Sequence, residues 1–164
     1  MRLALISDVH DNLLNLKKSL DYFDAQNIKK LLCCGDLTNL NTARYLATNF
    51  VGEIFIINGN SDNYLLSDLA RYPQIHHLGE IGFWTIAKKN IGLCHDPDKI
   101  KHLIIKKPNL DYIIYGHTHY PNYYTQNNIK LINPGNLAGI FYPASFAVLD
   151  IELPQIELKL LSNL

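Results

Sequence analysis

The chain has few cysteines, no excess charge of either sign and no long apolar run. Its three cysteines, Cys33, Cys34 and Cys94, are too few for a disulfide framework and lie in apolar runs, so we expect buried thiols in a reducing compartment. Fifteen Lys and Arg residues balance fifteen Asp and Glu residues, which does not favour binding to nucleic acid. No apolar run approaches a membrane span, and the run before Ser7 is too short for a signal-peptide core. These absences predict a cytoplasmic protein with neither a membrane nor a nucleic-acid partner.

The 164 residues contain ample apolar sequence for one packed core, since 48% are hydrophobic and 18% are charged. We expect a single domain over residues 1–164, without a linker or a repeat. Short apolar runs alternate with segments of helical period in the first half, which predicts an α/β layer architecture with parallel strands. Asn12 is the expected N-cap of the first helix.

The second half is expected to be mostly β-structure, beginning with a hairpin-like pair of strands. A helix is predicted between Asp96-Pro97 and Pro108, and a short one over residues 64–71, whereas His76 and His77 are predicted to be loop residues without function. We expect strands at residues 3–7, 30–34, 53–58, 82–88, 90–94, 112–115, 123–126, 130–133, 146–151 and 155–161.

Seven potential metal ligands stand directly after expected strands. Residues two apart in extended backbone point the same way, so Asp8 should converge with His10, and His117 with His119. The carboxyl ends of strands in an open sheet meet at one edge, which brings distant groups together. Nitrogen and oxygen ligands without thiolate suit Mn²⁺, Fe, Zn²⁺ or Ni²⁺ better than an all-oxygen site for Mg²⁺ or Ca²⁺. The five clusters are Asp8-Val9-His10, Gly35-Asp36, Gly59-Asn60, His95 and Gly116-His117-Thr118-His119.

These motifs, in this order, resemble the calcineurin-like metallophosphoesterases, whose motifs are D-x-H, G-D, G-N, H and G-H-x-H. The short chain, the Asn133-Pro134-Gly135 segment and the lack of a capping domain look most like the small bacterial and archaeal phosphodiesterase branch. The resemblance implies an α/β fold, a four-layer α/β/β/α sandwich with two mixed β-sheets flanked by helices. It also implies two divalent metal ions, with Mn²⁺ as the first candidate and Ni, Zn, Fe or Mg as alternatives. It assigns Asp8, His10, Asp36 and His119 to the first metal and Asp36, Asn60, His95 and His117 to the second, so that Asp36 is the bridge.

On this resemblance we expect hydrolysis of a small organic phosphodiester by in-line attack of a metal-bridging hydroxide. Two divalent ions, two carboxylates and one hydroxide leave a single positive charge, which mildly favours the monoanion of a diester over the dianion of a monoester. Asp36 and Asn60 are the expected catalytic residues. Asn60 is also expected to contact the substrate, as is Asn12.

Several positions depart from the family pattern. Ser61 stands where many relatives carry a histidine that is a candidate general acid, and Asp96 follows His95 where relatives often have glycine and another histidine. With two candidate proton donors missing, we predict that turnover depends steeply on the leaving-group pKa. Asp11, Asp62 and Asp96 either add negative charge around the metals or act as capping and loop acids.

Asn136 replaces a serine that commonly follows N-P-G in the family. Phe141 and Tyr142, just after it, form either a hydrophobic lip for substrate or a contact with a sister subunit, so a homo-oligomer stays open. The main rival function is a non-catalytic protein-binding module like the retromer subunit that shares this fold, against which the intact ligands argue. A nuclease of the same superfamily is disfavoured by the neutral charge.

Overall fold

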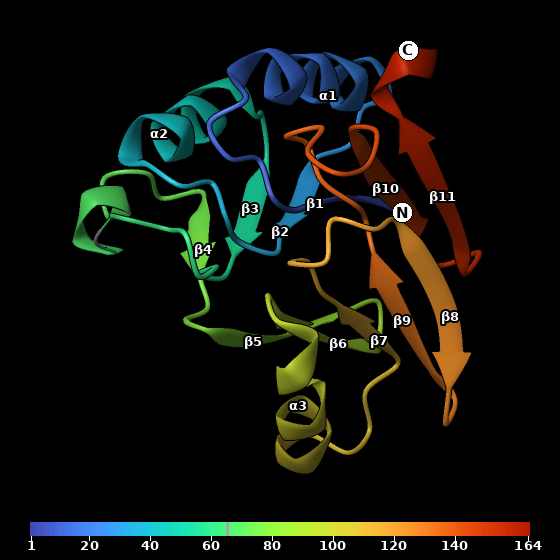
Figure 1. Cartoon of the computed structure of the whole chain (residues 1–164). Helices are drawn as coiled ribbons and strands as arrows, with labels where there is room; N and C mark the ends of the chain where they lie inside the picture. The colour runs from blue at the N-terminus through green and yellow to red at the C-terminus, as the bar shows by residue number, and fades with distance from the viewer. Residues whose placement is uncertain (65) are drawn as a thin grey trace.

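The computed structural model describes residues 1–64 and 66–164, which form two β-sheets packed face to face with helices on their outer faces (Figure 1). The six-stranded sheet has the order β11-β10-β1-β2-β3-β4, and the five-stranded sheet has the order β5-β6-β7-β9-β8. This is the expected four-layer α/β/β/α sandwich. The first sheet comprises β1 (Arg2–Ile6), β2 (Lys30–Cys33), β3 (Glu53–Ile56), β4 (Ile75–His77), β10 (Ser145–Asp150) and β11 (Gln155–Leu160). The second comprises β5 (Ile81–Ile86), β6 (Lys89–Cys94), β7 (Tyr112–Ile114), β8 (Asn122–Gln126) and β9 (Ile129–Asn133).

Both sheets are mixed. Strands β1, β2, β3 and β4 run parallel, while β10 pairs antiparallel with β1 and the edge strand β11 pairs antiparallel with β10. In the other sheet β6, β7 and β9 are parallel, and the hairpin partners β5 and β8 form its edges. Parallel neighbours place their carboxyl ends at the same edge, which is where the ligand clusters stand.

The helices bury one face each. Helices α1 (Leu13–Ala25) and α2 (Leu40–Asn49) cover the six-stranded sheet at the top of Figure 1, and α3 (Ile100–Lys106) lies beneath the other sheet. The predicted N-cap is confirmed, because the Asn12 side chain accepts the backbone N–H of Asn15 at 3.0 Å. Asp96 likewise caps the short 3-10 turn Pro97–Lys99 that leads into α3.

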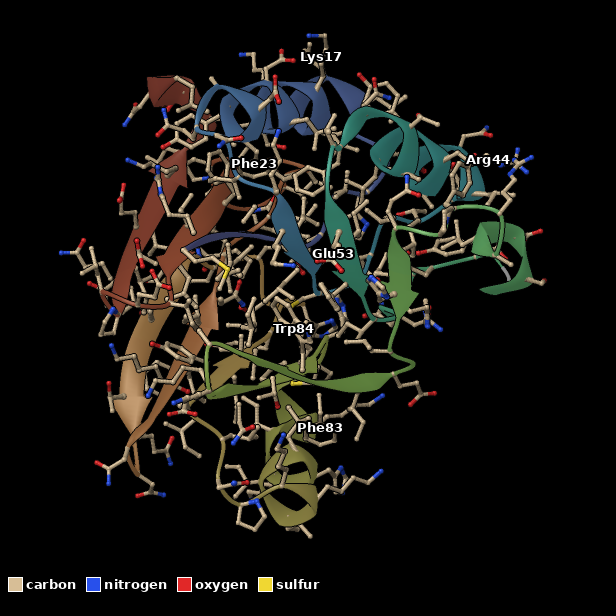
Figure 2. The ribbon with its side chains drawn as sticks, turned by 180° about the vertical axis from the view of Figure 1, so that it is seen from behind. Lys17, Phe23, Arg44, Glu53, Phe83 and Trp84 are labelled. Carbon is tan, nitrogen blue, oxygen red and sulfur yellow. The ribbon has the colours of Figure 1, made fainter. Side chains whose placement is uncertain are left out.

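Strand alternation separates the layers. Leu3 and Leu5 of β1 face the second sheet, whereas Ala4 and Ile6 face the helices, and all four are fully buried. Figure 2 shows the same alternation in β5, where Phe83 points toward α3 and Trp84 points between the sheets. The parallel strands are therefore buried on both faces, and this gives the clusters at their ends a rigid support.

Two sequence predictions need correction. Residues 75–77 form the edge strand β4 rather than a loop, and the partly buried His76 ring stacks on Phe55 with centroids 4.6 Å apart. A three-residue strand between a proline-containing turn and a glycine is too short to show alternation. The short helix expected over residues 64–71 is a 3-10 helix, Leu66–Leu69, and residue 65 lies outside the described residues.

Candidate active site

The seven candidate ligands gather at one edge of the sandwich, where strands of both sheets end. Asp8, Asp36 and Asn60 lie just beyond β1, β2 and β3 of the first sheet. His95 directly follows β6 and His117 lies beyond β7 of the second sheet. Burial is graded across the set, because Asp8 is 0% exposed, Asp36 2%, His95 4% and His119 8%. His10 is half-buried, and Asn60 and His117 are exposed, so the deepest charge is that of Asp8.

One group of ligand atoms consists of Asp8, His10 and His119. The His10 and His119 Nε2 atoms are 3.3 Å apart, and Asp8 Oδ1 lies 3.4 Å from His119 Nε2 and 3.9 Å from His10 Nε2. Ligand atoms of these three residues lie within 4.8 Å of one another, which is compatible with one metal ion between them. These are three of the four residues expected at the first metal.

A second group is built around His95. Its Nε2 atom lies 3.3 Å from Asp36 Oδ2 and 3.3 Å from His117 Nδ1, which in turn is 2.9 Å from Asn60 Oδ1. Asp36 Oδ2 is also 3.6 Å from His10 Nε2, so the same carboxylate oxygen faces both groups. The structure thus brings all seven residues together and places Asp36 between the two sets.

The Asp8 carboxylate shows that these residues fit a divalent cation. Among the described residues, Asp8 Oδ1 is a buried oxygen without a hydrogen-bond donor, although its partner Oδ2 accepts the His117 backbone N–H at 3.0 Å. An unsatisfied buried carboxylate oxygen is unfavourable. His95 Nδ1 lies 2.7 Å from the Cys34 carbonyl oxygen, which favours a proton on Nδ1 and directs Nε2 into the cluster. A cation between these atoms would satisfy the carboxylate and the imidazoles together.

The electrostatics of the site also favour a cation. Burial alone would raise the pKa of Asp36, but His95, the Ser61 backbone N–H and His10 outweigh it and hold that pKa at about 2. Burial would lower the pKa of His95, but Asp36 and Asp8 raise it, and Asp8 likewise raises the pKa of His119. The Asp36 carboxylate is therefore ionised at neutral pH, and protons compete with a metal ion at His95 and His119, whose pKa values are raised.

The backbone at the ligands is not extended, which corrects the sequence argument for their convergence. Asp8, His10, Asp36, His117 and His119 have φ values of 53°, 42°, 56°, 67° and 59°, all in the left-handed region. Asp8 Oδ1 and His10 Nε2 approach to 3.9 Å because the chain turns at these residues, not because they alternate along a strand, whereas His117 and His119 belong to different ligand groups and not to one convergent pair. Such conformations are strained for non-glycine residues and cluster at functional sites.

The G-D and G-N motifs pack directly against each other. Gly35 has φ +90°, and the backbone of Gly59 occupies the place where a Cβ of residue 35 would stand. A Cβ at Gly59 would in turn strike the Asp36 carboxylate. The Asp62 carboxylate joins the loops by accepting the backbone N–H groups of Gly59 at 2.8 Å, Asp36 at 3.1 Å and Thr38 at 2.8 Å. Asp62 is thus a loop acid that holds the motifs together.

The other departures from the family pattern have local explanations. Asp11 has φ +60°, a conformation for which glycine is favoured but which Asp tolerates, and its carboxylate accepts the Thr42 hydroxyl at 2.5 Å. Asp96 accepts the Asp98 N–H at 2.8 Å as a cap.

The Asn12 side chain caps α1 and donates to the Ala138 carbonyl at 3.0 Å, so its expected contact with substrate stays a prediction.

Sequence reasoning missed His77, which supports the Asn60 loop. Its Nδ1 accepts the Gly79 N–H at 3.0 Å, which leaves Nε2 as a donor to Asn58 Oδ1 at 2.8 Å. Burial lowers the pKa of His77, in keeping with a neutral ring. This hydrogen bond to Asn58 could have been predicted only if β4 had been recognised as a strand, because the pairing of β4 with β3 places His77 beside Ile56.

A cleft of about 280 Å³ opens beside the second group. Asn60, His95 and His117 form one side, and Lys99, Glu80 and Asp96 form the other. Lys99 Nζ lies 3.0 Å from Glu80 Oε2, so the positive charge at this rim is already paired. The cleft therefore offers a polar wall next to the ligands.

This combination of a two-sheet sandwich with histidines, carboxylates and an asparagine at its strand ends defines a metallophosphoesterase. A sequence model of the calcineurin-like phosphoesterase superfamily domain matches residues 1–153, and the chain belongs to this family. The expected resemblance is confirmed. The family consists of phosphoesterases that use divalent metals, so hydrolysis of a phosphoric ester is the activity at family level.

Individual relatives are similar in sequence or in fold. Phosphodiesterase MJ0936 of Methanocaldococcus jannaschii is 26% identical over 143 residues, which cover 85% of this chain and 86% of that protein. A solved structure of an archaeal phosphodiesterase matches with a TM-score of 0.88 and 24% identity, covering 98% of this chain and 99% of that one. Vps29 of Entamoeba histolytica, solved in complex with Zn²⁺, matches with a TM-score of 0.69 and 20% identity over 97% of both chains. In residues 1–64 and 66–164, no helix combines the length and apolar character needed to cross a bilayer.

Proposed function

We propose that the protein is a divalent-metal-dependent phosphodiesterase that hydrolyses a small organic phosphodiester. The observation that carries this proposal is that seven candidate ligands gather at one edge of the sandwich, where Asp8 has a buried, unsatisfied oxygen and Asp36 faces both groups. Two divalent ions, with Mn²⁺ as the first candidate, would supply positive charge for the phosphoryl oxygens and lower the pKa of the attacking water. Asp8, His10, Asp36 and His119 would hold the first, and Asp36, Asn60, His95 and His117 the second.

Charge and hydrogen bonding in the site support a diester. The two carboxylates, Asp8 and Asp36, offset half the charge of two divalent ions, and a hydroxide nucleophile would offset one charge more. The remaining single positive charge matches a phosphodiester monoanion. Asn60 is exposed beside the cleft, and its Nδ2 group has only the Ser61 hydroxyl, at 3.2 Å, as a partner among the described residues, so it can donate to a phosphoryl oxygen.

Hydrolysis of bis-p-nitrophenyl phosphate by chelated protein, before and after addition of Mn²⁺, Ni²⁺, Zn²⁺ or Mg²⁺, tests this proposal. We expect metal-restored turnover that exceeds the turnover of p-nitrophenyl phosphate, the monoester with the same leaving group. Asp36→Asn should abolish it, whereas Asp24→Asn, the same chemical change on the exposed face of α1, should leave it unchanged. Two bound ions without turnover of any diester would refute the proposal and favour a protein-binding module.

A further inference from the structure

An exposed aromatic surface stands beside the first ligand group. The Phe141 side chain is 88% exposed, and its ring centroid lies 5.7 Å from that of His119. Next to it, Tyr142 and Tyr120 are 41% and 51% exposed, with ring centroids 5.1 Å apart. We call these three residues, Tyr120, Phe141 and Tyr142, the aromatic lip. It is continuous with the metal site, because a candidate ligand touches its most exposed member.

We propose that the aromatic lip, with Phe141 as its main surface, binds a planar aromatic group carried by the non-leaving ester of the substrate. This inference rests on the proposed function and adds a substrate class, namely diesters in which one alcohol bears a heterocyclic or aryl ring. The other ester group then lies toward the polar cleft beside His117 and Lys99.

The backbone of Phe141 indicates that its exposure is not incidental. Phe141 has φ +65°, a conformation that is an outlier for a bulky side chain. A ring that is 88% exposed contributes little packing to offset this strain. The strained residue nevertheless holds its ring against His119, at the rim of the site. A bound ring that stacks on Phe141 would use this arrangement.

The loop that carries Phe141 is fixed by buried hydrogen bonds. Asn136 is 0% exposed, and its Oδ1 accepts the N–H groups of Gly139 at 2.6 Å and Ile140 at 3.0 Å. Its Nδ2 donates to the His119 carbonyl at 3.1 Å and to the Tyr142 carbonyl at 3.4 Å. A serine, which commonly follows N-P-G in the family, has one donor and cannot make all four contacts. Asn136 therefore ties the aromatic lip to the ligand loop and makes it a rigid surface.

The chemistry of the lip selects a planar group over an aliphatic one. The lip contains no Lys, Arg or His, so it offers no cationic side chain to a second phosphate, whereas a ring gains stacking on Phe141. A second groove, which shares Glu80 and Lys99 with the polar cleft, contains the aliphatic side chains of Leu78, Ile81 and Ile105, and Ile105 is 76% exposed. Ile105 is thus an exposed apolar residue outside the aromatic lip, and its substitution serves as the control.

Two substrates that share a leaving group test the proposal. Thymidine 5′-(p-nitrophenyl phosphate) and ethyl p-nitrophenyl phosphate both release p-nitrophenol, and both carry a primary alkyl oxygen as the other ester. The ratio of their kcat/KM values with Mn²⁺ therefore reports the contacts of the thymidine group alone. We expect Phe141→Ala to lower this ratio about five- to tenfold, the effect of losing one stacking partner. Ile105→Ala should leave the ratio unchanged.

Conservative variants at position 141 separate stacking from folding. Alanine, tyrosine and leucine all carry a Cβ, so none relieves the backbone strain, and the position is 88% exposed. Phe141→Tyr should retain the substrate ratio, while Phe141→Leu should lower it as Phe141→Ala does. An unchanged ratio in Phe141→Ala would overturn the proposal.

A binding measurement distinguishes failure of this inference from failure of the proposed function. If metal-loaded protein hydrolyses neither substrate, calorimetric titration with the intact thymidine diester shows whether the lip still binds the aromatic group. Binding that weakens five- to tenfold in Phe141→Ala would refute the proposed diesterase activity and keep the lip as an aromatic-binding site. Absence of binding would overturn both. Sedimentation that shows a wild-type dimer and a Phe141→Ala monomer would assign the lip to a second copy of the chain and overturn the inference.

Discussion

Replacing Asp36 by Asn tests the central feature of the proposed site, namely that one carboxylate serves both metal positions. The substitution keeps the shape of the side chain, and its Oδ1 atom can still accept the Ser61 N–H at 2.8 Å, so the loop should fold as before. What changes is Oδ2, which lies 3.3 Å from His95 Nε2 and 3.6 Å from His10 Nε2. The variant therefore removes one negative ligand from each group at once.

The size of the effect follows from ligand chemistry. Loss of an outer partner of a metal ligand typically costs 10–100-fold in affinity, so loss of a charged ligand should cost at least about 100-fold at both positions. At a metal concentration about 1,000 times the wild-type Kd, each ion stabilises the fold by about 4.1 kcal/mol, and in the variant by about 1.4 kcal/mol. For a chain of 164 residues, the rise in Tm per ion should fall from about 8–16 °C to about 3–6 °C.

Metal content and thermal unfolding measured together check this prediction. After desalting, wild-type protein should retain two ions, Asn60→Ala one, and Asp36→Asn none, because Asn60 touches only the second group. Asp24→Asn controls for the amide substitution. If Asp36→Asn keeps one ion at wild-type affinity, the carboxylate does not bridge, and the argument from its Oδ2 contacts is wrong.

Other properties of the site and core lead to three further predictions. Turnover should rise steeply as the leaving-group pKa falls, because Ser61 and the Asp96-Pro97 pair stand where relatives carry two histidines that are candidate proton donors; equal rates for p-nitrophenyl and alkyl diesters would contradict this. His77→Gln should make the Tm less sensitive to acid, because burial lowers the pKa of His77 in the folded protein. The neutral ring therefore contributes fully to the free energy of unfolding above pH 6.5, and that contribution is lost as the pH falls through the folded-state pKa. Comparing melting curves at pH 7.5 and pH 5 checks it, and an unchanged difference would refute it. Phe23→Ala should lower the free energy of unfolding by about 3–5 kcal/mol, because Phe23 is 0% exposed and packs edge-on against Phe146 at 4.9 Å. Urea denaturation measures that loss, and a loss below about 1 kcal/mol would show that the site repacks.

The individual strands and helices were predictable because their signals are local, whereas the four-layer arrangement was implied by the family resemblance. Apolar runs such as residues 3–7 and 30–34 are long enough to identify as strands, and Asn12 and Asp96 mark helix starts by the chemistry of capping. Strand β4 was not predictable, because a strand of three half-buried residues at a sheet edge has no alternation to detect. Its histidine, His77, was therefore missed as a partner of the Asn58 loop.

The membership of the site could be read from the sequence, but its geometry could not. Strand ends identify which residues meet, whereas the positive φ values of Asp8 and His119 depend on contacts between loops that are distant in sequence. The role of Asn136 was equally hidden, since its four hydrogen bonds involve the His119 carbonyl and the loop before Tyr142. Contacts of this kind between loops produce no periodic pattern in the amino-acid sequence.

The ligand loops concentrate unfavourable terms that the rest of the fold must offset. Left-handed conformations at non-glycine residues cost of order 1–3 kcal/mol each, and five of the seven candidate ligands adopt them. The unpartnered Asp8 oxygen adds a desolvation cost of about 1–3 kcal/mol. Strands β1 and β2, buried on both faces, hold these loops in place despite that cost. A cation bound between Asp8 and the histidines would satisfy this oxygen and offset its desolvation cost, so we expect metal binding to stabilise the fold.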